Sequence, residues 1–177
     1  MIAYAAYGSN MNRQQMLDRT NHEAEPIGTA LLRDWQLAFR WGVLTVVPRP
    51  GGVVPLVLWQ ISDAARQELD YYEGAPRVYA PRMLPVSALE LLTEISADKQ
   101  ADEYLIYEMT ATGRNAVSRA GAPSTAYYDT CVQGYLDFGL QEWSDMLMAA
   151  RERSLTENTR SSDSAITKVT SNCSGTP

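Results

Sequence analysis

Hydrophobic and polar side chains alternate along much of the first half of the chain, which is the pattern of β-strands. Residues 2–7 follow this two-residue period, which stops at a Gly-Ser-Asn turn. Asn10 in that turn is a good helix cap, and it predicts a short helix that carries Met16 and Leu17. Prolines and glycines within residues 48–52 predict a break between two later strands. The further predicted strands are residues 28–32, 35–40, 43–47, 53–61, 81–87 and 103–110.

Helical patterns become frequent towards the C-terminus. Ser62 caps a predicted helix that ends at Glu73-Gly74, and Ser124 caps another that ends at Gly139. Strands that come before helices indicate an α+β fold. We expect a single domain with a mixed, mainly antiparallel sheet, curled towards a small barrel, with flanking helices. The apolar face of the final predicted helix consists of Leu140, Trp143, Leu147 and Ala150.

The composition changes near Arg153. The chain has 177 residues, of which 45% are hydrophobic, and this suits one globular domain. After Arg153, however, Ser, Thr and Asn dominate, and such a segment buries too little apolar surface to offset its ordering entropy. We therefore expect a folded domain at residues 1–153 and a flexible tail at residues 154–177.

The charge and the cysteines narrow the range of partners and compartments. A formal net charge of −6 disfavours nucleic acid and anionic membrane surfaces as partners. No apolar run is long enough to span a bilayer, and the first residues lack the basic and apolar regions of a signal peptide. Cys131 and Cys173 lie far apart, so a disulfide framework is not expected. Together these features favour the cytoplasm.

Several common kinds of site are missing from the sequence. It contains no phosphate-binding glycine loop, no dinucleotide fingerprint and no cluster of Cys and His, so we expect neither a cofactor nor a metal. His22 is the single histidine and lies in a polar run, which disfavours a Ser-His-Asp triad. The chemistry that remains is that of a carboxylate, hydroxyl groups and backbone amides.

One candidate segment is residues 4–10, in which a strand enters a glycine-containing turn and then a helix start. Unpaired N–H groups at such a place can bind a carboxylate or an oxyanion, and Gly8 would allow close approach to the backbone. The alternative interpretation is an ordinary connection capped by Asn10.

A second candidate segment is residues 69–79, around Glu73. This carboxylate lies at a helix end, where the dipole disfavours it, and tyrosines surround it in the sequence. Partly apolar surroundings raise the pKa of a carboxyl group, which suits an acid–base residue. The alternative interpretation is a solvated glutamate that precedes a helix-ending glycine.

The chain resembles the γ-glutamylcyclotransferase-like (AIG2-like) family in both segments and in two others. Residues 4–10 match its Y-x-x-Y-G-S-N signature, and residues 69–74 match L-D-x-x-E-G, whose Glu is catalytic in the family. Residues 107–110 resemble a strand that supplies a tyrosine to the pocket. Residues 123–127, followed by Gly134, resemble a P-S-x-x-Y…G helix whose Tyr contacts the ligand. The resemblance therefore implies Glu73 as the catalytic residue. It implies as substrate-binding residues Tyr4, Ala5, Ala6, Tyr7, Gly8, Ser9, Asn10, Tyr79, Tyr107 and Tyr127.

The resemblance also implies a reaction. Such a protein converts a small γ-glutamyl amino acid or γ-glutamyl amine to 5-oxoproline and the free amine, without a cofactor. Glu73 would act first as general base and then as general acid while the α-amine attacks intramolecularly. Asn10 and the Y-G-S-N pattern disfavour the glutathione-specific and γ-glutamylamine branches, and the leaving amine stays open. Leu56, where the family usually has glycine, and the adjacent Pro55 are departures that could reshape the sheet.

Two other functions remain open. The chain could be a non-catalytic protein that binds a small molecule on the same fold, although a pure binder gains nothing from desolvating a carboxylate such as Glu73. A serine hydrolase built on Ser9 would lack a base, because His22 is the single histidine.

Overall fold

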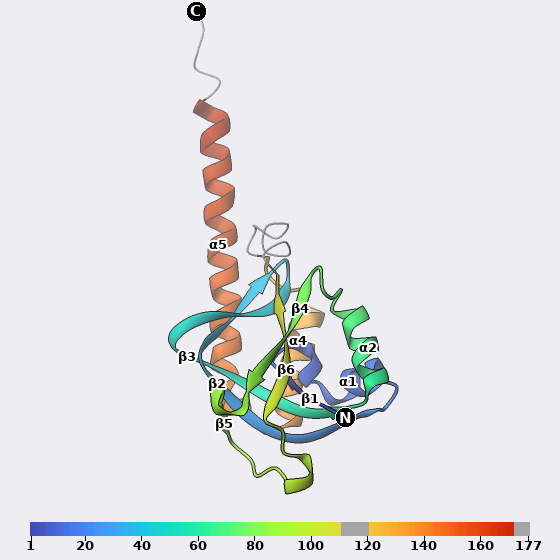
Figure 1. The fold of residues 1–177 in the computed structure, drawn as a ribbon. Helices are drawn as coiled ribbons and strands as arrows, with labels where there is room; N and C mark the ends of the chain where they lie inside the picture. Colours follow the sequence, from blue (N-terminus) through green and yellow to red (C-terminus); the bar gives the residue numbers. More distant parts are fainter. Residues whose placement is uncertain (111–120, 172–177) are drawn as a thin grey trace, which may run out of the picture.

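The computed structural model describes residues 1–110 and 121–171, which form a curled sheet flanked by helices (Figure 1). The six-stranded sheet has the order β4-β6-β1-β3-β2-β5. Only the β1–β6 pair is parallel, and the other neighbouring pairs are antiparallel. This arrangement confirms the predicted α+β class with a mixed, mainly antiparallel sheet. The strands are β1 (Ile2–Ala6), β2 (Ala24–Arg40), β3 (Val43–Ile61), β4 (Tyr79–Pro85), β5 (Leu89–Leu91) and β6 (Glu103–Met109).

The long β2–β3 hairpin corrects the strand boundaries. Each of these strands is continuous, whereas the sequence predicted two separate strands in the place of each. The turn-forming residues are absorbed as a bulge: Asp34 and Gly51 both have positive φ, and the Gly51 N–H donates to Asp34 Oδ1 at 2.8 Å. Pro55 and Leu56 pair with Leu31 and Ala30 without a register shift at that point, so they leave the ladder intact.

The helices begin mostly where the sequence predicted. Ser62 caps α2 (Asp63–Tyr72) and Ser124 caps α4 (Thr125–Asp137), each accepting a hydrogen bond from a backbone N–H. The predicted cap at Asn10 is wrong, because Asn12 caps α1 (Arg13–Arg19) instead. Asn10 lies in the 3₁₀ helix η1 (Ser9–Met11), and its side chain is used elsewhere. The other 3₁₀ helices are η2 (Val86–Ala88), η3 (Ala97–Lys99) and η4 (Gln141–Trp143).

The last helix, α5 (Ser144–Ser171), continues beyond the predicted domain boundary at Arg153. Its C-terminal part extends away from the sheet in Figure 1. The segment after the boundary is thus helical as far as Ser171, and its flexibility stays a prediction. No helix in the described part of the chain has the length and apolar character needed to cross a membrane.

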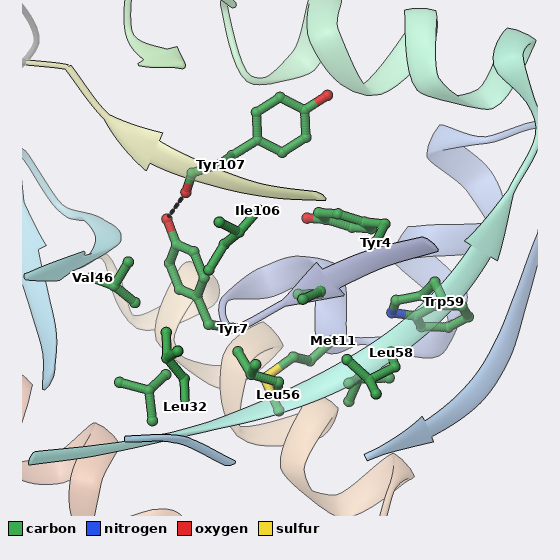
Figure 2. Packing of buried hydrophobic residues seen from close by; sticks show 14 of the residues in the cluster. Tyr4, Tyr7, Met11, Leu32, Val46, Leu56, Leu58, Trp59, Ile106 and Tyr107 are labelled. Carbon is green, nitrogen blue, oxygen red and sulfur yellow. Dashed lines mark hydrogen bonds between the residues drawn. The ribbon is translucent and has the colours of Figure 1, made fainter. Parts of the chain in front are cut away.

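The core lies between the curled sheet and the helices (Figure 2). Trp59 of β3 is fully buried and meets Phe138, just after α4, edge to face with 5.5 Å between ring centroids. Gly134 allows α4 to approach η1 closely, because a Cβ there would lie 2.7 Å from Met11 Cβ. This contact holds the turn after β1 against α4.

Candidate active site

A pocket opens beside the C-terminal end of β1, where that strand runs into η1. It brings together Glu73 and most of the residues that the resemblance implied, which come from β1, η1, α2, β4, β6 and α4. The residues that line it are Tyr4, Tyr7, Gly8, Ser9, Asn10, Arg19, Val43, Leu44, Tyr72, Glu73, Tyr79, Tyr107 and Tyr127.

Ala5 and Ala6 do not line this pocket. They are 0% and 1% exposed and belong to the core, where they pair with Leu58 and Val57 of β3. Both belong to the family signature as strand residues, and here their small side chains fill space between packed elements. The structure therefore gives them a packing role in place of the expected contact with substrate.

Glu73 belongs to a short polar network. The Asn10 side-chain amide donates to Glu73 Oε1 at 2.9 Å and to the Tyr4 hydroxyl at 2.9 Å. Arg19 donates from Nη1 to Asn10 Oδ1 at 2.6 Å. Asn10 is 4% exposed, so these bonds satisfy a buried amide that would otherwise be costly to desolvate. The network joins the end of α2 to β1, η1 and α1.

The surroundings of Glu73 shift the pKa of its carboxyl group in opposite directions. Burial raises the pKa of the Glu73 carboxyl above its ordinary value of 4.5, while the charge of Arg19 and the hydrogen bond from Asn10 lower it. The net direction is upward. A carboxylate whose affinity for protons is raised in this way is a better general base than a solvated glutamate.

The turn after β1 presents backbone donors at the pocket. The N–H groups of Gly8, Ser9 and Asn10 make no hydrogen bond with the residues that the structure describes. Ser9 and Asn10 are nevertheless buried, and a buried N–H without a partner is unfavourable unless a bound group supplies an oxygen. These donors therefore suit a carboxylate or an oxyanion of a ligand.

Tyrosines form much of the pocket wall, and three of the six described ones have hydroxyl groups that hydrogen-bond to backbone. Tyr7 donates to the Tyr107 carbonyl at 2.6 Å (Figure 2), and Tyr79 donates to the Leu44 carbonyl at 2.7 Å. Tyr127 accepts from the Leu44 N–H at 3.2 Å. Burial raises the pKa of Tyr7, Tyr79 and Tyr127, so all of them are neutral near pH 7.

Tyr107 lines the pocket, but its hydroxyl group is used elsewhere. It donates to Asp70 Oδ1 at 2.6 Å, and Arg66 binds the same oxygen at 3.0 Å. Asp70 belongs to α2, so this contact fastens α2 to β6 just before Glu73. The proton of the Tyr107 hydroxyl is thus used to position α2, and a substrate contact through its oxygen stays a prediction.

Four of the described lining residues were not predicted from the sequence: Arg19, Val43, Leu44 and Tyr72. Val43 and Leu44 reach the pocket only because the β2–β3 hairpin curls over it. Arg19 is the last residue of α1, the helix that follows residues 4–10, and its positive charge is the sequence feature that indicates a contact with an anionic group. Tyr72 directly precedes Glu73, so its place at the pocket could have been inferred from the helix end.

Other kinds of site are not supported by this geometry. His22 is exposed in the turn after α1 and does not line the pocket, so Ser9 has no histidine beside it. Within residues 1–110 and 121–157, no three His, Cys, Asp or Glu side chains gather in a way that could hold a metal ion.

Comparison with solved structures places the fold. A gamma-glutamyl cyclotransferase superposes with a TM-score of 0.65 at 23% identity, over 84% of this chain and 86% of that one. An uncharacterized protein from Homo sapiens gives 0.64 at 24% identity, over 84% and 86%. YkqA from Bacillus subtilis gives 0.59 at 21%, over 82% of this chain and 54% of YkqA. At these identities the likeness shows a shared fold.

Sequence comparison gives the family. A search of curated proteins found no match to this chain. The sequence profile described as gamma-glutamyl cyclotransferase, AIG2-like, however, matches residues 4–128, which include every residue lining the pocket. The chain therefore belongs to the gamma-glutamyl cyclotransferase, AIG2-like family.

Proposed function

We propose that this protein is a cyclotransferase that converts a γ-glutamyl amino acid or γ-glutamyl amine to 5-oxoproline and the free amine. The observation that carries the proposal is Glu73, a carboxylate with a raised pKa that lies in the pocket and is held there by Asn10. The family and the cyclotransferase with the same fold supply the reaction class.

The proposed chemistry needs only one proton carrier. The α-amine of the substrate is an ammonium at neutral pH and cannot attack until it loses a proton, which Glu73 accepts. The amine nitrogen then bonds to the γ-carbonyl carbon, and the bond from that carbon to the leaving nitrogen breaks. Glu73 returns the proton to the leaving nitrogen. The new ring nitrogen still carries a second proton, which Glu73 takes up and passes to the released amine, so the products are 5-oxoproline and an ammonium and the enzyme ends in its starting state. Because the attack is intramolecular, fixing the right conformer supplies much of the acceleration.

The pocket offers complementary partners for the charges of a γ-glutamyl group. The free N–H groups of Gly8, Ser9 and Asn10 can receive the α-carboxylate or the oxyanion that develops at the γ-carbon. A donor aimed at the oxyanion is worth roughly 3 kcal/mol of transition-state stabilisation. Tyr7 and Tyr79 donate their own protons to backbone, so their oxygens remain acceptors for the substrate ammonium.

The partner that we propose is a small molecule alone, with neither nucleic acid nor membrane involved. The acidic net charge of −6 and a pocket that contains one carboxylate support this proposal. On the sequence grounds given above we also propose that the protein works in the cytoplasm and needs no cofactor.

The test is turnover of a panel of γ-glutamyl amino acids and γ-glutamyl amines, followed by mass spectrometry of 5-oxoproline. We expect product from at least one substrate, with one free amine released for each 5-oxoproline. A panel member that is bound but never consumed would support the alternative, a non-catalytic binding protein on the same fold. Glutamate formed in place of 5-oxoproline would show hydrolysis and would overturn the proposal.

A further inference from the structure

Arg19 is the feature of the pocket that the proposed chemistry does not use. Among the described lining residues it is the only one with a cationic side chain. It is the last residue of α1, and its guanidinium lies 5.1 Å from the centroid of the Tyr72 ring, which is a cation–π geometry. Its Nη1 donates to Asn10 Oδ1 at 2.6 Å, one of the shorter side-chain contacts at the site.

This contact sets the direction of the Asn10 amide. A guanidinium can only donate hydrogen bonds, so the oxygen of the amide must face Arg19. The amide nitrogen then faces the other way and gives one hydrogen to the Tyr4 hydroxyl and the other to Glu73 Oε1. With the amide reversed, its NH₂ would face the guanidinium and its oxygen would face the carboxylate, which are two repulsive contacts.

The direction of the amide makes the two oxygens of Glu73 unequal. Oε1 faces an N–H donor, so a proton on Oε1 would place two hydrogens against each other. Oε2 has no hydrogen-bond partner among the residues that the structure describes. The oxygen that is able to take and return a proton is therefore Oε2.

The orientation of the Asn10 amide also determines which hydrogen bonds the Tyr4 hydroxyl can make. Its hydroxyl oxygen accepts from Asn10, and its own hydrogen has no acceptor among the described residues. Tyr4 lines the pocket, and burial raises the pKa of its hydroxyl, so the proton stays on at neutral pH. Tyr4 is thus left as a donor to an oxygen of the ligand.

We propose that Arg19 is a positioning residue that holds the Asn10 amide in one direction, so that Glu73 exchanges protons through Oε2 and Tyr4 donates to the substrate. The catalytic part of this inference rests on the proposed cyclotransferase function. The part that concerns the hydrogen-bond network rests on geometry alone.

Arg19 also lowers the pKa of Glu73 directly through its charge. The test has to separate this direct effect from the effect that passes through the Asn10 amide. The only other charged or titratable side chains that line the pocket within the described residues are tyrosines, and burial raises the pKa of Tyr4, Tyr7, Tyr79, Tyr107 and Tyr127. The lining tyrosines are Tyr4, Tyr7, Tyr72, Tyr79, Tyr107 and Tyr127. A direct charge effect does not depend on Asn10, whereas an effect through the amide disappears without it.

The experiment is a carboxyl ¹³C NMR titration of Glu73 in the full chain. Four proteins form a double-mutant cycle: wild type, Arg19→Met, Asn10→Ala and the double variant. We expect Arg19→Met to raise the pKa of Glu73 more in the wild-type background than in the Asn10→Ala background. Equal shifts in the two backgrounds, or no shift at all, would overturn the proposal. Arg13→Met is the matched control, because Arg13 belongs to the same helix, contacts Phe138 and does not line the pocket.

The titration needs no turnover, so its result is independent of the proposed reaction. Absence of 5-oxoproline would refute the proposed function and leave the network testable by NMR. If Arg19→Met does not fold, Asn10→Ala alone decides: its loss of the bond to Oε1 must raise the pKa of Glu73, and an unchanged pKa would overturn the proposal. In an active enzyme, the acid limb of kcat/KM should move to higher pH in Arg19→Met and stay in place in Arg13→Met.

Discussion

The residues around Glu73 make its carboxylate a better proton acceptor than a solvated glutamate. Burial disfavours its charged form, and the cation of Arg19 and the amide of Asn10 partly restore it. The result is a carboxylate that stays accessible from the pocket and takes up a proton more readily than a solvated glutamate does.

Replacing Glu73 with Gln removes the proton acceptor and keeps nearly the same shape. We expect kcat to fall by about 10²–10⁴-fold, the usual contribution of a general acid–base residue, with little change in ligand affinity. Steady-state kinetics and ligand titration measure the two effects separately. Glu68→Gln is the matched control, because Glu68 is an exposed residue of the same helix. Equal activity of wild type and Glu73→Gln would refute the acid–base role.

The same residue links stability to pH. The pKa of Glu73 is raised on folding, so the folded protein binds more protons than the unfolded chain between the ordinary value of 4.5 and the raised one. Stability from this group is therefore complete below the unfolded pKa and is lost as the pH rises through the folded pKa. We expect the free energy of unfolding of wild type, relative to Glu73→Gln, to decrease across this window in urea titrations. A difference that grows with pH would contradict the assignment.

At the scale of elements, close contacts between helices, strands and turns hold the site together. The Tyr107–Asp70 hydrogen bond fastens α2 to β6, and Gly134 lets α4 touch η1. Both contacts join segments that are distant in sequence. Neither can be recognised from the local pattern of hydrophobic and polar residues.

Gly134→Ala tests the contact between α4 and η1. The added Cβ would lie 2.7 Å from Met11 Cβ and 2.8 Å from Asn12 N, so the turn that carries Gly8 and Ser9 must shift. We expect a loss of about 1–3 kcal/mol of stability, as for overpacked cores, although alanine favours helix. Activity should fall as well, because the N–H groups of Gly8 and Ser9, which we propose bind the substrate, would move with the turn. Gln133→Ala, at an exposed neighbouring position, is the control and should lower the free energy of unfolding far less. Chemical denaturation measures both variants.

The difference between continuous motifs and contacts between distant segments explains how much of this protein could be predicted from its sequence. Residues 4–10 and 69–74 are continuous segments, and their motifs indicated Glu73 and the turn donors. The sheet class followed from the order of strands and helices. The bulge at Asp34 and Gly51 was predicted as a break, because a turn-forming residue in a bulge has the same local signature as one in a loop. Strand β5 has 3 residues, too few for a period to show.

The rest of the site depends on packing between distant segments. Val43 and Leu44 line the pocket because the long β2–β3 hairpin is curled. Ala5 and Ala6 do not line it because they are buried in the core on β1. Arg19 enters because α1 turns its last residue towards Asn10. None of these outcomes follows from spacing along the chain.

For the whole molecule, the question is how much of the chain the site needs. The described residues that line the pocket all lie between Tyr4 and Tyr127, and none of them belongs to α5. Its first part is nevertheless tied to the sheet: Arg153 donates to the Leu37 carbonyl at 2.9 Å, and Glu157 pairs with Arg40 at 3.2 Å. Ser154 is 2% exposed, so packing continues past Arg153.

Two truncations separate these contributions. Removing residues 158–177 should leave kcat/KM within about twofold and stability nearly unchanged, as for changes away from packed features. Ending the chain after Arg153 removes buried Ser154 and the half-exposed pair of Arg40 and Glu157, which is worth at most about 1 kcal/mol. We expect that variant to be less stable and still active, as thermal unfolding and kinetics would show. A large loss of activity in either variant would mean that α5 supports the site.

The measurement that tests the central claim most directly is turnover of a γ-glutamyl substrate in H₂¹⁸O, with both possible products analysed by mass spectrometry. Cyclisation consumes no water, so the wild-type protein should release 5-oxoproline without ¹⁸O, together with an equal amount of free amine. Glu73→Gln should release almost none. Glutamate that carries ¹⁸O, or equal amounts of 5-oxoproline from the two proteins, would contradict cyclisation by Glu73.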